Sequence, residues 1–190
     1  MLGQPVRLQI GDWPPRLEWL EERLFATVPR PLILRQILQR GTWDDAYLVL
    51  SHLLAHLLFT PHAYHAIDDS KMLTLLGILE DVRVESLWRR GYPGTNFARL
   101  WEAELPLYEK AVSEHATPTN LLLLAAVGGS LPETASQVAR WYFHECVSAV
   151  ERVQVASFAA VLREATRLRL LAAVSYTHLR AHETEADLVC

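Results

Sequence analysis

The chain has 190 residues, 51% of them hydrophobic and 21% charged, and its formal net charge is −4 at pH 7. A chain with this slightly acidic charge has no excess of basic residues to attract nucleic acids or anionic membranes, so we expect neither as a partner. The longest strongly apolar run, residues 121–127, is too short to cross a bilayer, so we expect no membrane insertion. Residues 1–11 show no signal-peptide pattern, and Cys146 has no cysteine partner before residue 174, which favours a cytoplasmic protein.

Leucine, alanine, arginine and glutamate dominate the chain, and period-two alternation is scarce. These features predict an all-α fold, a multi-helix bundle of about six to seven helices with a long C-terminal helix. From the N-terminus we expect a helix over residues 15–26 that starts at a Pro-Pro pair, and a short helix over residues 32–39. A third helix follows an N-cap at residues 42–45 and ends near residue 59, and its almost wholly apolar surface favours a central position.

Cap and breaker residues predict the next two helices. A fourth helix over residues 71–90 is capped at residues 69–70, and Gly91 stops it in the left-handed conformation. A fifth helix covers residues 95–113, and Pro106 kinks or breaks it.

Two further starting signals lie in the last third of the chain. A sixth helix opens at residues 117–118 and ends at the glycine pair 128–129. Residues 130–133 (SLPE) match a capping box, from which a helix runs to residue 172 and either leads into the missing part of the protein or bends once.

The end of the chain, residues 174–190, has a different character. Residues 174–184 (VSYTHLRAHET) resemble the conceptual translation of a transposase-type sequencing adapter, two variable residues follow, and residues 187–190 (DLVC) fit the adapter's continuation. Segments of this kind are excluded from reasoning about the fold. We therefore expect a helical domain over residues 1–173, the N-terminal fragment of a larger protein, and a non-native tail over residues 174–190.

The fourth helix carries charge within an apolar pattern. On a helical wheel Arg83 falls inside the apolar stripe, Glu80 at its edge, and Asp81 and Glu85 on the opposite face. A buried guanidinium without acceptors costs several kcal/mol, so Arg83 either reaches solvent or meets acceptors inside the fold. Glu80 and Arg83 are three apart and can pair, which favours a structural polar network between the third and fourth helices. The functional alternative is a pocket for a ligand or partner with these residues in its wall.

Two histidines on the third helix, His52 and His56, are four residues apart and share one face. At this spacing two imidazoles can bind one divalent metal, with Glu80 as the first candidate for a third ligand and Asp81 or Glu85 as the next. The stretch is HLLAH, which lacks the glutamate of the zinc-peptidase motif. The alternative is a pair of structural histidines bonded to Arg83, Glu80 or the backbone.

Aromatic residues gather around a Pro-Gly turn after the fourth helix. An exposed patch there would provide a partner surface made of Trp88, Tyr92, Pro93 and Trp101, and core packing is the alternative.

Residues 144–146 (HEC), on the last predicted helix, are consecutive in the chain. Consecutive side chains point in different directions on a helix, so we expect no catalytic set there.

The motifs at His52-x-x-x-His56, residues 79–85 (LEDVRVE) and residues 92–94 (YPG) together resemble the N-terminal helical region of the NorD/CobT group of proteins. The match covers about residues 50–105. In that group the helical region precedes a von Willebrand factor A domain, whose Asp-x-Ser-x-Ser metal motif is absent from this chain, as is the usual acidic linker.

This resemblance implies a non-enzymatic accessory module that works with a MoxR-type AAA+ ATPase and a client metalloenzyme. The process would be metalloenzyme activation or metal insertion, with no cofactor in this fragment. Two alternatives stay open. One is a metal-binding helical domain or metal-dependent enzyme that uses His52, His56 and a carboxylate. The other is a helical scaffold without a site.

Overall fold

The computed structural model describes residues 7–11, 16–20, 23–29, 44–61, 63–64, 67–102 and 104–187. It begins with a small sheet of strand order β1-β3-β2, made of β1 (Arg7–Gly11), β2 (Arg16–Leu20) and β3 (Arg23–Pro29). β1 pairs with β3 in parallel, and β2 pairs with β3 antiparallel.

The helix predicted over residues 15–26 is therefore wrong. Residues 16–19 (RLEW) alternate polar and apolar, which suits a strand, and residues 25–28 (FATV) include the aromatic and β-branched types that favour sheets. The pairing between β2 and β3 adds inter-strand hydrogen bonds that a helical interpretation of the leucines and arginines leaves out. The helix predicted over residues 32–39 lies outside the described residues.

The rest of the described chain is helical, which confirms the predicted all-α multi-helix bundle with a long C-terminal helix. The helices are α2 (Asp44–Phe59), α3 (Ser70–Gly91), α4 (Ala98–Glu102), α5 (Leu105–Glu114), α6 (Pro118–Ala126), α7 (Gln137–Val153) and α8 (Phe158–Asp187). None of the helices in the described part of the chain combines the length and apolar character that a bilayer-crossing segment needs.

Side-chain caps start two helices where the sequence predicts them. The Asp69 carboxylate accepts the Met72 amide at the start of α3, and the Thr117 hydroxyl accepts the Asn120 amide at the start of α6. The C-terminal end of α3 differs from the prediction, because Gly91 belongs to the helix and Tyr92, at φ −134°, ends it.

Two predicted long helices are divided. The fifth helix is split into α4 and α5, and Pro106 lies in the first turn of α5, where its missing N–H costs no hydrogen bond. The capping box at residues 130–133 is also wrong: Ser136 caps α7 instead, accepting the Ala139 amide at 3.2 Å. A break after α7 lets α8 fold back against it, with Ser157 at the start of α8.

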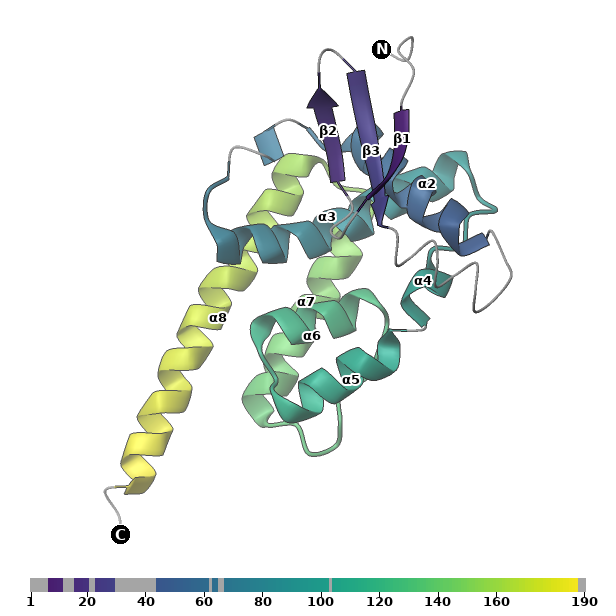
Figure 1. Cartoon of the computed structure of the whole chain (residues 1–190). Helices are drawn as coiled ribbons and strands as arrows, with labels where there is room; N and C mark the ends of the chain where they lie inside the picture. The colour runs from purple at the N-terminus through teal and green to yellow at the C-terminus, as the bar shows by residue number, and fades with distance from the viewer. Residues whose placement is uncertain are drawn as a thin grey trace.

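The central element of the bundle is α3, which contacts α2 on one side and α6, α7 and α8 on the other. The larger apolar core joins α3 to α6, α7 and α8, and the smaller one consists of Leu48, Ala55, Val84, Trp88 and Phe97. The sheet lies beside α2, and the C-terminal end of α8 projects away from the other helices (Figure 1). Because α3 is covered on both sides, its polar face also packs against other helices and is only partly exposed, and the candidate site lies there.

Candidate functional site

An ion pair between Glu80 and Arg83 lies inside the bundle. The exposed fraction of Glu80 is 0% and that of Arg83 is 5%. The guanidinium donates from Nε to Glu80 Oε2 at 2.8 Å and from Nη2 to Glu80 Oε1 at 2.5 Å. The same Nη2 donates to the carbonyl oxygen of Phe59 at 2.8 Å. That carbonyl is one of the last in α2, where a cation also meets the negative end of the helix dipole.

Thr60, just after α2, extends this pair toward the histidines. Its hydroxyl donates to Glu80 Oε1 at 2.8 Å, and its oxygen lies 3.0 Å from His56 Nδ1. Sequence reasoning missed Thr60. The available signal was its spacing, because a residue four positions after His56 lies on the same helical face.

Two carboxylates of α3 meet the two histidines of α2. His56 Nε2 lies 2.9 Å from Asp81 Oδ1, and His52 Nδ1 lies 2.8 Å from Glu85 Oε1. The second oxygen of Glu85 accepts the indole N–H of Trp101, on α4, at 3.3 Å. The helical wheel places Asp81 and Glu85 correctly, opposite the apolar stripe, but that side faces α2 and α4, and Glu85 is buried.

The charge of His52 is set by two opposing influences. Burial acts to lower the pKa of the imidazole, whereas the hydrogen bond to Glu85 and the negative charges of Asp81 and Glu85 act to raise it. The pKa of His52 is raised overall, so the carboxylates have the larger effect.

A group of three side chains in this network can hold a metal ion. His52, His56 and Asp81 each offer one donor atom, and the three atoms all lie within 4.8 Å of one another. The sequence ranks Glu80 first as the third ligand, but Arg83 and Thr60 already engage both of its oxygens, and Asp81 lies beside the imidazoles instead.

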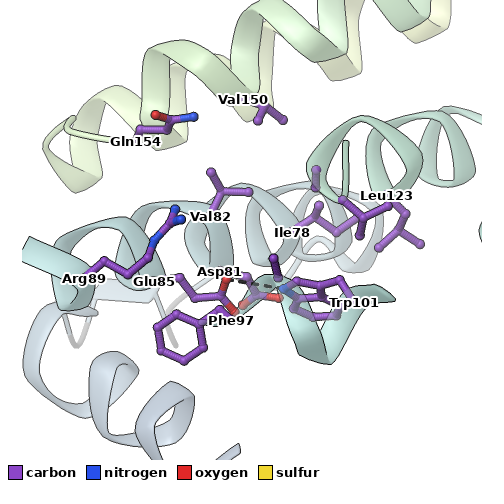
Figure 2. A pocket seen from close by; sticks show the side chains of 13 residues that line it. Ile78, Asp81, Val82, Glu85, Arg89, Phe97, Trp101, Leu123, Val150 and Gln154 are labelled. Carbon is purple, nitrogen blue, oxygen red and sulfur yellow. Dashed lines mark hydrogen bonds between the residues drawn. The ribbon is translucent and has the colours of Figure 1, made fainter. Parts of the chain in front are cut away.

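A partly open cavity of about 150 Å³ adjoins the network, and Asp81 and Glu85 belong to both. Figure 2 shows the carboxylates of Asp81 and Glu85 next to Trp101 in its wall. Much of the remaining wall is apolar and comes from α3, α6 and α7, including Ile78, Val82, Leu123 and Val150. Of the four charged residues at positions 80, 81, 83 and 85, Asp81 and Glu85 line the cavity, whereas Glu80 and Arg83 do not.

The aromatic residues near the Pro-Gly turn divide between core and surface. Trp88 is 7% exposed, donates its indole N–H to the Thr95 hydroxyl at 3.1 Å, and stacks on Tyr92 with ring centroids 4.5 Å apart. Tyr92 is 55% exposed, Pro93 is also exposed, and Trp101 is half-buried.

Residues 144–146 do not form a common site, which agrees with their helical spacing. His144 is exposed, and Glu145 pairs with Arg167 of α8. Cys146 is fully buried, and its burial raises the pKa of the thiol to about 12.

Comparisons of the chain with protein-family models, with curated proteins and with solved structures find no match. The functional argument therefore depends on the residues and geometry described above.

Proposed function

We propose that this chain is a non-enzymatic accessory module, similar to the N-terminal helical region of NorD/CobT-like proteins. In this proposal it works in the cytoplasm with a MoxR-type AAA+ ATPase, in the activation of a client metalloenzyme or in metal insertion. One observation supports it most: the charged side chains of residues 80–85 are bonded within the fold. Because the charged side chains of this segment connect α2, α3 and α4, we assign it a structural role. Contacts with partner proteins would then be made by exposed surfaces elsewhere on the chain.

The exposed ring of Tyr92, with Pro93 beside it, is our candidate contact for the ATPase. The stack on buried Trp88 holds the Tyr92 ring in place, so the contact costs little conformational entropy. We expect Tyr92→Ala to weaken binding to a purified MoxR-type ATPase about tenfold or more in a calorimetric titration. Trp141→Ala is the matched control, because Trp141 is an exposed aromatic residue on α7. Equal effects of the two substitutions, or no binding by the unaltered chain, would contradict the proposal.

The genomic locus offers a second test. The proposal predicts a downstream reading frame with an Asp-x-Ser-x-Ser motif and a neighbouring gene for an AAA+ ATPase. A locus with neither feature counts against the family resemblance, whatever the binding experiment shows.

A specific observation favours a second candidate, a metal-binding helical domain or metal-dependent enzyme. The three donor atoms of His52, His56 and Asp81 are close enough to share one ion. We expect purified protein to retain about one equivalent of divalent metal after dialysis, and His52→Ala with His56→Ala to remove it. Metal content that does not depend on these histidines would exclude this candidate and leave a scaffold or the accessory module.

A further inference from the structure

We propose that His52, His56 and Asp81 bind a divalent transition ion of the zinc type, through Nε2 of both imidazoles and one carboxylate oxygen. Glu85 and Thr60 act as outer partners that orient the two rings. This inference rests on the second proposed function, and it names the class of ion, the ligand atoms and their supports.

The hydrogen-bond directions around His56 lead to this assignment. The single hydroxyl hydrogen of Thr60 is donated to Glu80, whose carboxylate is paired with Arg83 and can only accept. The Thr60 oxygen must therefore accept from His56, so the Nδ1 of His56 carries a hydrogen. In a neutral ring this leaves a lone pair on Nε2, 2.9 Å from Asp81 Oδ1. Two acceptors at this distance repel each other unless a proton or a metal ion lies between them, and a divalent ion bound there would take the place of the proton.

His52 has the same arrangement with a different support. Its Nδ1 lies 2.8 Å from Glu85 Oε1, and the other Glu85 oxygen accepts from Trp101, so the carboxylate is held in place to receive the ring N–H. The Nε2 of His52 then lies toward Asp81, 3.9 Å from Oδ1. A carboxylate that orients a histidine from its far nitrogen is a common support for metal ligands in proteins.

The donor set and its dimensions select the class of ion. Two imidazole nitrogens and one carboxylate suit zinc and its neighbours, whereas magnesium and calcium prefer oxygen ligands. With metal–ligand distances of about 2.0–2.1 Å, the ligand atoms of a tetrahedral site lie about 3.3 Å apart. The two distances from Asp81 Oδ1, 2.9 and 3.9 Å, lie on either side of this value.

The site is also accessible. The side chains of His52, His56 and Asp81 are 19%, 22% and 33% exposed, so an ion can enter from solvent without unfolding of the bundle. Three protein ligands leave a fourth position for water or another donor, as in zinc sites that react or exchange ligands.

The test uses the full chain without an affinity tag, with His178→Ala and His182→Ala as background. These two histidines are also four apart, on α8, and could bind metal independently. Cobalt(II) is the spectroscopic probe. We expect one ion per chain with the intense visible absorption of four-coordinate cobalt, displaced by equimolar zinc and not by a large excess of magnesium.

Substitutions then separate ligands from supports. His52→Gln, His56→Gln and Asp81→Asn should abolish the four-coordinate spectrum, and Glu85→Gln and Thr60→Val should weaken cobalt binding about 10- to 100-fold. His144→Ala, at an exposed histidine on α7, should change nothing. Circular dichroism checks that each variant stays helical, and the spectrum of the unsubstituted site reports the coordination independently of all variants.

The outcomes separate this inference from the second proposed function. If cobalt binds through the histidines but is six-coordinate or is displaced by magnesium, the zinc-type assignment is overturned while metal binding stands. If cobalt binding survives the loss of both histidines, the ligand assignment is overturned. If neither cobalt nor zinc binds, this inference and the metal-binding function both fail, and the ATPase proposal keeps its own test.

Discussion

Individual residues of this chain show how a fold accommodates charge in an apolar interior. The guanidinium of Arg83 contacts both oxygens of Glu80 and a carbonyl at the end of α2, so none of these three groups is buried alone. A bidentate contact of this kind also fixes the directions of both side chains. The pair therefore connects the middle of α3 to the last turn of α2.

A double-mutant cycle measures this connection. Arg83→Leu or Glu80→Leu alone strands a buried charge and should lower the free energy of unfolding by about 3–5 kcal/mol, as judged by urea denaturation. The double replacement should cost less than the sum of the two, with a coupling of about 0.5–3 kcal/mol. The exposed pair of Lys110 and Glu114 is the control, with an expected coupling of about 0.3–0.5 kcal/mol. Additive losses at Glu80 and Arg83 would mean that the pair does not stabilise the fold.

The partners of the histidines could not be predicted at this scale. His52 and Glu85 are 33 positions apart, and His56 and Asp81 are 25 apart. Which carboxylate meets which imidazole depends on the position of α2 along the axis of α3. No local sequence pattern encodes that relative position. For the same reason Glu80, the first candidate for a metal ligand, gives way to Asp81.

At the level of elements, helix starts were predictable where the cap signal pointed to one place in the chain, as at residues 69–70 and at Thr117. Between Gly129 and α7 two serines compete, and Ser130 has the better local motif. Helix α7 begins after Ser136 because the apolar stripe that packs into the core starts just after this residue. The buried members of that stripe are Ala139, Tyr142, Cys146, Ala149, Val150 and Val153.

Substitution of the two serines tests this explanation. Ser136→Ala removes the oxygen that accepts the Ala139 amide and should lower the free energy of unfolding by about 1 kcal/mol. Ser130→Ala, the matched control, should change it by less than about 0.5 kcal/mol. Thermal and urea denaturation followed by circular dichroism measure both. If Ser130→Ala lowered the free energy of unfolding more than Ser136→Ala, the helix start predicted at residues 130–133 would be supported instead.

The hairpin of α7 and α8 carries an acid-sensitive ion-pair cluster. Glu164 accepts from Arg152 at 2.9 and 3.0 Å and from Arg167 at 2.9 Å. Burial acts to raise the pKa of Glu164, but its hydrogen bonds with the two arginines outweigh burial and hold the pKa below the ordinary value of 4.5.

This shift predicts a pH dependence of stability. The stabilisation by ionised Glu164 is fully present above its ordinary pKa and is lost as the pH falls through the lowered, folded-state pKa. Because Arg152 is about half-exposed, we expect only about 1 kcal/mol at neutral pH. Urea denaturation from neutral pH to about pH 3 should show a shallower pH dependence for Glu164→Gln than for the unaltered chain. Glu114→Gln, in the exposed pair with Lys110, is the control, and an equal change there would contradict the assignment.

At the level of the whole molecule, α3 organises the bundle because helices pack on both of its sides. The last helix, α8, follows this core only as far as its buried residues. Leu168 is fully buried, Leu171 and Ala172 are half-buried, and Val174 is 53% exposed. We infer that the stability of the bundle depends on α8 up to about residue 172.

Truncation tests this inference. Removal of residues 174–190 should change the free energy of unfolding by less than about 1 kcal/mol, because it removes no side chain of the described core. A chain ending at Glu164 loses Ala165 and Leu168, both fully buried, and should not fold stably. Thermal denaturation of the two truncated chains decides the point, and a large drop in Tm for the first would show that the tail contributes to the fold.

Local signals in the amino-acid sequence were enough for the helical class, for the end of α2 and the starts of α3 and α6, and for the expectation that Arg83 either reaches solvent or meets acceptors. Each of these follows from propensity, capping or the cost of burying charge, which act over a few residues. The N-terminal strand pairing, the break between α7 and α8, and the meeting of His52 and His56 with Glu85 and Asp81 emerged only from the packed chain. Apart from the hairpin of β2 and β3, they depend on contacts between separate segments, whose relative positions are set by the sum of many apolar contacts and not by any short motif.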